Sequence, residues 1–512
     1  MAGILICTFV GGLGVLPQLA ASDLTWCYPY MGPDSWDWLA NGLSWSGVPI
    51  PSTFRPPGLP LVITLLDRVS AIPLLPYLTF ARLGLAAVLL HRLVRQRHSS
   101  LVTALAVLLF VSNGSLFGYT RYVMGEVWTL PFLLAAALAF VRAAGEPRAY
   151  LSSALFLSVS FLFHYAGAIV GIAFALAVLM FRRESLATRW PWRALLVALP
   201  LPAIWLFVRW LHNRSSPNAH LVEFLIHPSF HNVWYFAVVA TALLGLALLP
   251  LYLAGLFRLL LVRAHRISPW TQAVLFPLLC LTIFFVLIYD WADKRFLYYL
   301  FPFAVAVAAE GIAMLMDWAR RGRLHAIGVA VILALMLIWN RIPYPASSHR
   351  LLALSPRTFV DLVDGWPGNR IHSGAAGSLA LFTADGFFAF ARPAGGCPFP
   401  AEEAATPALR TWLEAHLEPA DPVALENGTV DPGVFWSERR HFAVALERHV
   451  VKPGEARFSV RIGGLAGLSQ AAPLASFGPF AVVDAQIAAQ SEPIPQHPRP
   501  KRHRKRARSA QG

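Results

Sequence analysis

Long apolar runs separated by short loops determine what this chain can fold into. About eleven such runs precede residue 340, and many approach the roughly 17–25 residues with which a helix crosses a membrane. They lie at residues 4–20, 71–90, 101–117, 127–141, 151–163, 166–181, 194–211, 233–257, 273–289, 296–316 and 326–339. Only 13% of the residues are charged, whereas a soluble protein averages about a quarter. The sequence therefore predicts an all-α polytopic membrane protein with about 11 transmembrane helices.

Arginine-rich loops alternate along the chain with loops that carry acidic and other polar side chains. Arg95, Arg183 and Arg321 lie in basic loops of this kind. Because cytoplasmic loops are the ones enriched in Lys and Arg, the intervening loops are expected on the extracytoplasmic face. We predict a multi-pass protein of a bacterial inner (plasma) membrane. This topology explains the formal net charge of +15 better than a nucleic-acid partner would.

The composition changes after residue 341. More than half of the acidic residues follow this point, and the apolar runs become short and alternating. Strand-like segments at 379–382, 387–391, 442–446 and 458–462 surround a helical segment at 408–417. These features predict a transmembrane domain at 1–341, a small α/β or α+β domain at 342–492 and a disordered basic tail at 493–512. The odd number of spans places the second domain outside the cytoplasm.

Residues 31–60 form the most unusual polar stretch, because two carboxylates open a Trp-rich amphipathic segment between apolar runs. Asp34 and Asp37 are placed to cap a helix and to interact favourably with its dipole. A carboxylate at the edge of a bilayer is also a candidate for function, since it is costly to keep there. We expect the helix to end at Gly47 and the chain to turn back into the membrane after Arg55. The residues by themselves leave capping and catalysis equally supported.

Three motifs, taken in order, resemble the GT-C superfamily of integral-membrane glycosyltransferases. The first is Asp-Ser-x-x-aromatic-Leu-Ala from Asp34, followed by Arg-Pro-Pro-Gly-Leu-Pro from Arg55. The second is Tyr-Thr-Arg-Tyr-Val-Met-Gly-Glu-Val-Trp at 119–128, and the third is Lys-Arg-Phe-Leu-Tyr-Tyr-Leu-Phe-Pro at 294–302. The combination is most similar to the branch of aminoarabinose and protein O-mannosyl transferases.

The resemblance implies sugar transfer from a polyprenyl-phosphate carrier to a hydroxyl of a lipid, glycan or protein acceptor on the extracytoplasmic face. Asp34 is then expected to be the general base of an inverting displacement. Candidate phosphate ligands are Arg55, Lys294 and Arg295. The full set of candidate substrate-binding residues is Asp37, Arg55, Arg121, Glu126, His164, Lys294 and Arg295.

Several alternatives stay open at this point. Glu126 could instead cap the helix that follows it, and His164 could be structural. Asp290 and Asp293 could hold a metal ion or pair with their basic neighbours, so a divalent cation stays open and no cofactor is predicted. Glu310 lies within a run and has no evident partner in the sequence.

Two other functions would also use many spans. A transporter or lipid flippase places coupling sites near the midplane, often in repeated halves, whereas here the carboxylates gather at one face and no repeat is visible. A non-enzymatic anchoring protein predicts no defect when Asp34 is changed.

Overall fold

A computed structural model describes parts of the chain that form two units. The described residues are 33–47, 55–71, 74–113, 116, 123–215, 230–261, 268–289, 294–340, 400–418, 421–427, 450–451, 456–462, 473–477 and 480–485. Their contacts divide the chain into one unit with residues 1–403 and 431–447 and another with residues 404–430 and 448–512. Each unit is described by itself below.

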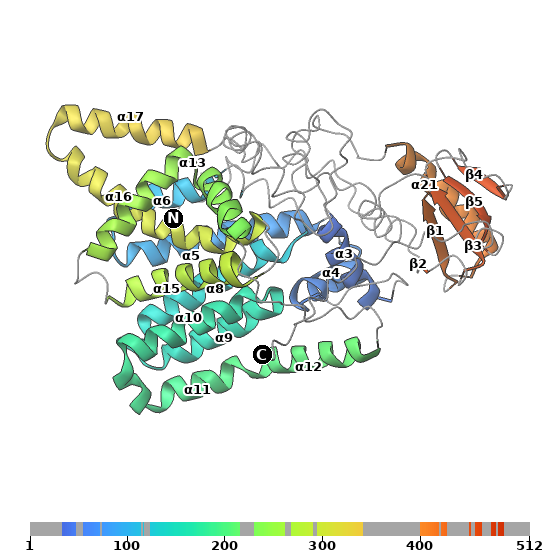
Figure 1. Cartoon of the computed structure of the whole chain (residues 1–512), viewed down its shortest axis with the longest axis horizontal. Coiled ribbons are helices and arrows are strands. Elements are labelled where there is room, and N and C mark those ends of the chain that lie inside the picture. The colour runs from blue at the N-terminus through green and yellow to red at the C-terminus, as the bar shows by residue number, and fades with distance from the viewer. Residues whose placement is uncertain are drawn as a thin grey trace, which may run out of the picture. The chain divides into compact units, whose positions relative to one another are not determined.

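The first unit is helical (Figure 1). Its α-helices are α3 (Pro33–Trp45), α4 (Gly58–Arg68), α5 (Leu75–Arg95), α6 (Ser100–Val111), α8 (Gly125–Arg142), α9 (Ala149–Phe163), α10 (Ala166–Phe181), α11 (Arg189–Ala198), α12 (Pro200–Ser215), α13 (Phe230–Leu261), α15 (Pro269–Ile283), α16 (Leu297–Ala319) and α17 (Arg323–Asn340). Shorter turns are η2 (Arg183–Ala187), the π-helical η3 (Phe284–Ile288) and η4 (Lys294–Phe296).

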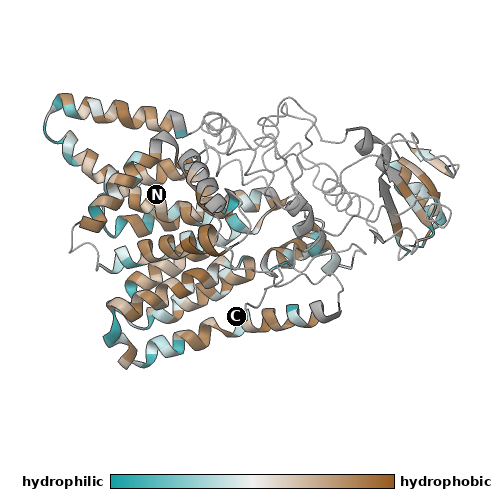
Figure 2. Ribbon diagram, in the orientation of Figure 1, coloured by the Kyte–Doolittle hydropathy of each residue, from teal (hydrophilic) through white to brown (hydrophobic). Residues whose placement is uncertain are grey.

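Five helical segments in the described residues are long and apolar enough to cross a membrane. They are Tyr77–Arg95, Gly125–Arg142, Arg189–Leu211, Pro269–Ile288 and Leu297–Ala319, and five shorter apolar helices accompany them. Figure 2 shows hydrophobic residues along most of these helices and hydrophilic residues concentrated at helix ends. The polytopic helical class is therefore confirmed. The number of eleven spans stays a prediction, because the run at 4–20 lies outside the described residues.

Helix α16 lies at the centre of the first unit. Its residues from Leu297 to Ile312 are all buried, and it packs against α6, α13, α15 and α17. Gly255 of α13 and Gly311 of α16 bring the two backbones into contact, since a Cβ atom at either position would clash with a carbonyl of the facing helix. Small residues permit this close approach between membrane helices. The packing positions Arg295, in η4 just before α16, and Glu310 within α16.

Helices α3 and α4 pack against one another beside the longer helices. Trp38, Leu39 and Leu43 of α3 are buried, as the amphipathic pattern predicts. The helix ends before Gly47, whose φ of +103° lies in the left-handed region that favours glycine. The predicted helix and its stop at Gly47 are thus confirmed, but α3 begins at Pro33, so Asp34 lies in its first turn and is not the N-cap that the sequence offered.

The second unit contains α21 (Pro400–His416), most of which lies in this unit, and a five-stranded sheet. The strands are β1 (Val423–Asn427), β2 (Val450–Val451), β3 (Phe458–Ile462), β4 (Ala475–Phe477) and β5 (Phe480–Asp484), in the order β2-β1-β3-β5-β4. Strand β1 runs parallel to β2 and β3, whereas β5 runs antiparallel to β3 and β4. Trp412 of α21 packs on Phe458 of β3, with ring centroids 5.2 Å apart.

Two of the predicted segments coincide with elements of this unit. Strand β3 covers the segment at 458–462, and α21 contains most of the segment at 408–417. The predicted strands at 379–382, 387–391 and 442–446 lie outside the described residues. The domain limits at 341 and 492, the basic tail and the side of the membrane stay predictions.

The orientation of the helices can be tested with single cysteines in a variant that lacks the native ones. Gln96 and Gly322 are exposed and lie in the basic turns after α5 and α16. We expect cysteines at both positions to resist membrane-impermeant thiol reagents in intact cells, and a reporter fused after Asn340 to register outside the cytoplasm. Labelling of the Gln96→Cys protein from outside would invert the orientation and move the candidate site to the cytoplasmic face.

Candidate active site

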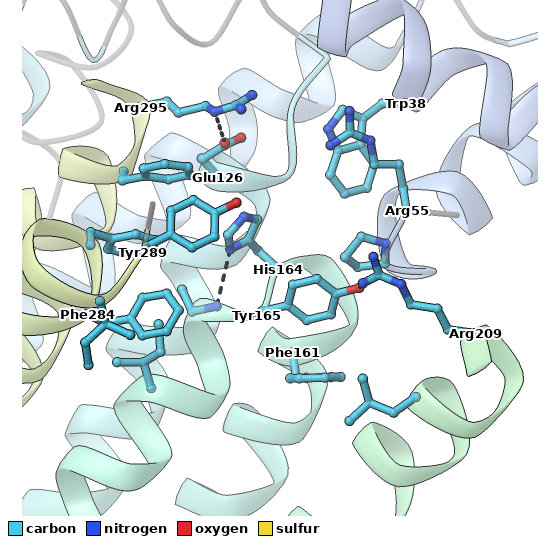
Figure 3. A pocket seen from close by; sticks show the side chains of 17 residues that line it. Trp38, Arg55, Glu126, Phe161, His164, Tyr165, Arg209, Phe284, Tyr289 and Arg295 are labelled. Carbon is cyan, nitrogen blue, oxygen red and sulfur yellow. Dashed lines mark hydrogen bonds and ion pairs between the residues drawn. The ribbon is translucent and has the colours of Figure 1, made fainter. Parts of the chain in front are cut away.

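The structure brings four of the predicted site residues together. Arg55, Glu126, His164 and Arg295 line one cavity of about 530 Å³. The other described lining residues are Trp38, Pro56, Phe161, Tyr165, Ala166, Ile169, Leu206, Arg209, Phe284, Phe285, Ile288, Tyr289 and Phe296. These residues come from segments between α3 and the start of α16, so the fold of the whole helical unit creates the cavity (Figure 3).

The other predicted site residues are described in part or not at all. Asp34 and Asp37 are the second and fifth residues of α3, and Lys294 opens η4, but the structure does not describe these side chains. Arg121 lies outside the described residues, as do Asp290 and Asp293.

Glu126 and Arg295 form an ion pair at the cavity, with 3.7 Å between Oε1 and Nε. Glu126 lies in the first turn of α8, where the helix dipole favours a negative charge, and its side chain is almost completely buried. The N-cap position of α8 belongs to Met124, so Glu126 is not the cap that the sequence left open. The pair holds Arg295 at the cavity wall. Because Glu126 is buried, loss of Arg295 would remove a compensating charge and destabilise the protein.

His164 lies between α9 and α10 and is neutral at physiological pH. Its Nδ1 atom accepts a hydrogen bond from the backbone N–H of Ala166 at 3.2 Å, and its ring centroid lies 4.7 Å from that of Tyr299. Burial, together with the positive charges of Arg295 and Arg55, lowers the pKa of His164 to about 3. Since Nδ1 accepts, the neutral ring carries its proton on Nε2, which can only donate.

This protonation state gives a pH prediction. The unfolded chain would protonate His164 below about pH 6.5, whereas the folded protein does so only near pH 3. Lowering the pH between these values therefore favours unfolding, and the native ring stays neutral from pH 5 to 8. Nitrogen NMR of labelled histidine, assigned with a His164→Gln variant, should show no protonation step of this ring in that range. A midpoint near 6.5 would contradict the buried environment.

Arg209 of α12 is a cavity residue that the sequence analysis missed. Its Nη1 donates a hydrogen bond to the hydroxyl of Tyr165, and its guanidinium carbon lies 5.3 Å from the centroid of the Tyr165 ring. The buried Nε atom has no hydrogen-bond partner among the described residues. Figure 3 shows Arg209 and Arg55 on the side of the cavity opposite Arg295. An arginine inside the apolar run 194–211 was the signal that could have revealed it.

Arg55 is held by contacts to α3. Its guanidinium carbon lies 5.5 Å from the centroid of the Trp38 ring, and its backbone N–H donates to Oδ1 of Asn41 at 3.3 Å. Arg55, Arg209 and Arg295 thus face the cavity together with a single carboxylate, that of Glu126, among the described lining side chains. The excess of positive charge suits an anionic ligand.

The wall opposite α9 and α12 is aromatic. Phe285 of η3 stacks on Phe296 with ring centroids 4.6 Å apart, and Tyr289 contacts Phe296 edge-on at 5.1 Å. Single π-helical turns such as η3 are frequent at functional sites. The cavity therefore combines arginines with an apolar wall, which is the combination that an amphiphile with an anionic head requires.

No group of three or more metal-ligating side chains occurs among the residues that the structure describes. The divalent cation stays open, because Asp290 and Asp293 lie outside them.

Comparison with known proteins identifies the fold. A family model for dolichyl-phosphate-mannose-protein mannosyltransferases matches residues 55–207. The structure is similar to that of ArnT from Cupriavidus metallidurans bound to undecaprenyl phosphate, with 14% identity, a TM-score of 0.57 and coverage of 96% of this chain and 99% of that one. The chain has the GT-C fold. The resemblance that the three motifs indicated is confirmed at this level.

Two archaeal structures are similar to this chain as well. The oligosaccharyltransferase of Archaeoglobus fulgidus tethered with an acceptor peptide matches with 14% identity and a TM-score of 0.51, over 89% of this chain and 64% of that one. AglB from the same organism, in complex with an inhibitory peptide and a dolichol-phosphate, matches with 13% identity and a TM-score of 0.50, over 90% of this chain and 69% of that one. No curated protein matches the sequence.

Proposed function

We propose that this protein transfers a sugar from a polyprenyl-phosphate carrier to an acceptor hydroxyl on the extracytoplasmic face of a bacterial inner membrane. The cavity carries the proposal, because three arginines and an aromatic wall meet in it. The similar ArnT structure holds undecaprenyl phosphate, and a similar archaeal structure holds a dolichol-phosphate. A lipid-linked donor would place its phosphate at the arginines and its hydrocarbon chain against apolar surface.

In the proposed reaction, an acceptor oxygen attacks the anomeric carbon and the bond from that carbon to the phosphate oxygen breaks. The electron pair stays on the phosphate, which leaves as polyprenyl phosphate, and the configuration inverts. Arg55, Arg209 and Arg295 stabilise the charge that develops on the leaving phosphate. Nε2–H of His164 donates to an oxygen of the bound donor.

Asp34 is the proposed general base that takes the proton of the acceptor hydroxyl. Residues four apart lie one above the other on the same helix face, so Asp34 shares a face of α3 with Trp38, which lines the cavity. Asp37 directly precedes Trp38 and is rotated by about 100° around the helix axis. This geometry favours Asp34 as the base and leaves Asp37 a supporting role in substrate binding.

The cavity lies at helix ends, which disfavours a transporter or flippase. Glu126 is in the first turn of α8, His164 separates α9 from α10, and Arg295 precedes α16. Coupling sites in transporters instead lie near the midplane of the membrane.

Deletion of the gene, followed by mass spectrometry of surface glycolipids, glycans and proteins, tests the function. We expect one sugar to be missing from one class of acceptor and to return with the wild-type gene. An accumulated lipid-linked donor that stays on the cytoplasmic side would instead indicate a flippase.

A further inference from the structure

A second cavity, of about 310 Å³, lies along α16 away from the candidate active site. Arg295 precedes α16, whereas Glu310 and Asp317 follow the start of the helix by 13 and 20 residues. At a rise of 1.5 Å per residue, Glu310 lies roughly 20 Å along the helix axis. The basic loops place this end of α16 at the cytoplasmic face. The charged side chains that line this cavity are Arg97, Arg258, Glu310, Asp317 and Arg320, and His98 lies beside them.

Glu310 is the centre of the cluster, and the structure supplies the partners that its sequence context lacks. The carboxylate is buried and forms an ion pair with Arg97. Nε2 of His98 lies 3.6 Å from Oε1, and Nε of Arg258 lies 3.6 Å from Oε2. One buried carboxylate is therefore shared between two arginines.

Arg97 is fixed in its position by further contacts. Its guanidinium carbon lies 5.1 Å from the centroid of the Trp270 ring, and Nη1 donates to Oγ of Ser268 at 3.3 Å. Trp270 is itself held by a hydrogen bond from Nε1 to the carbonyl of Leu93 at 2.8 Å. Arg97 is thus both an ion-pair partner of Glu310 and part of the local packing.

Arg258 has hydrogen-bonding capacity that the cluster does not use. Its distance of 3.6 Å to Glu310 exceeds the roughly 2.7–2.9 Å of a charge-assisted hydrogen bond. Its buried Nη1 atom has no hydrogen-bond partner within the described part of the chain. Arg320, at the outer part of the same cavity, is 74% exposed and pairs with Asp317 at 2.9 Å. Arginine hydrogen-bond donors are therefore present both inside the cavity and at its mouth.

The surface beside Arg258 is apolar. Phe257 and Leu261 of α13 are 63% and 57% exposed, and Met314 of α16 is exposed as well. A cavity of this volume holds about ten water molecules at their liquid volume, which is enough for a phosphate group. Cationic donors next to lipid-exposed apolar side chains match a phosphate that carries acyl chains.

We propose that this cavity binds the phosphate group of an anionic ligand at the membrane face opposite the candidate active site. Arg258 donates to the phosphate from inside, and Arg320 contacts it at the mouth. A phospholipid of the cytoplasmic leaflet and a free phosphate share this chemistry, and the exposed side chains of α13 favour the lipid.

The test uses the full-length protein in nanodiscs of phosphatidylcholine alone or of equal parts phosphatidylcholine and phosphatidylglycerol. Native mass spectrometry counts the phosphatidylglycerol molecules that stay bound, and phosphorus NMR in phosphatidylcholine discs detects binding of inorganic phosphate. We expect Arg258→Gln to weaken retention of phosphatidylglycerol about tenfold and Arg320→Gln about fivefold, because each removes a donor charge. The exposed Arg142, at the end of α8 and outside the cavity, supplies the control Arg142→Gln.

The outcomes separate the two sources of phosphate. Retention of phosphatidylglycerol that depends on Arg258 and Arg320 but not on Arg142 supports a lipid site, and the same dependence for inorganic phosphate supports a soluble ligand. Equal binding by all three variants and the wild type overturns the proposal. If Arg258→Gln lowers the thermal unfolding temperature in neutral discs, Arg320→Gln decides, because its exposed side chain can be changed without disturbing the packing.

Discussion

Asp34→Asn is expected to lower the rate of sugar transfer by about 10² to 10⁴-fold while the protein stays folded. Asp34 is the second residue of α3, so Asn there removes only the favourable interaction of one carboxylate with the helix dipole, about 0.3–1 kcal/mol, and the start of α3 should be preserved. An amide cannot accept the proton of the acceptor hydroxyl. The measurement is transfer of labelled sugar from polyprenyl phosphate by purified protein in nanodiscs, with thermal unfolding followed in parallel.

The matched control for this substitution is Asp37→Asn. It lies in the same turn of α3 but is rotated away from the face that Trp38 occupies, so its effect on the rate should be smaller. Wild-type activity of Asp34→Asn would show that Asp34 serves only the first turn of the helix. The base would then have to be sought at Asp37 or Glu126.

Arg209→Gln is expected to lower sugar transfer by about 10² to 10³-fold, the usual effect of removing one preorganised donor from a developing oxyanion. Arg209 faces the cavity from α12, and Glu126, the one described carboxylate of the lining, pairs with Arg295 instead. Replacement of Arg209 therefore leaves the ion pair of Glu126 intact, and the free energy of unfolding should change little. The assay compares kcat and KM for the lipid-linked donor.

Two further variants test whether the effect of Arg209→Gln arises from a phosphate contact. Tyr165→Phe removes the hydroxyl that receives the hydrogen bond from Arg209 but keeps the ring and the charge, so its loss of activity should be smaller. Arg193→Gln changes an arginine that stacks on Trp190 in α11 and does not line the cavity. A loss of activity as large in Arg193→Gln as in Arg209→Gln would argue against a phosphate contact at Arg209.

Arg209 and Arg295 have different partners, so their replacement affects folding to different extents. Interfacial charges that face a water-filled pocket add little to stability, and on this ground alone Arg295 would be a simple residue to replace. The structure pairs it with the buried Glu126 instead, so its replacement mixes folding with catalysis. Arg209 donates to the hydroxyl of Tyr165 and not to a carboxylate, so it allows the cleaner test.

The sequence by itself determined the helical membrane class, most of the helices and the order of the motifs. Helix α10 covers the predicted run at 166–181, and α3 ends before the predicted Gly47, because apolar length, amphipathic spacing and a glycine stop are properties of a few consecutive residues. Arg55, Glu126, His164 and Arg295 were also named from the sequence, since polar residues at the ends of apolar runs are conspicuous.

Only the tertiary structure decided which of these residues meet. Glu126 pairs with Arg295 from the start of a different helix, Arg209 joins them from inside an apolar run, and Glu310 finds Arg97 and Arg258 on the α5–α6 turn and on α13. Partners across such separations depend on which helices pack side by side. That choice follows from side-chain shape and from close contacts such as those at Gly255 and Gly311, which the hydropathy of a single run does not contain.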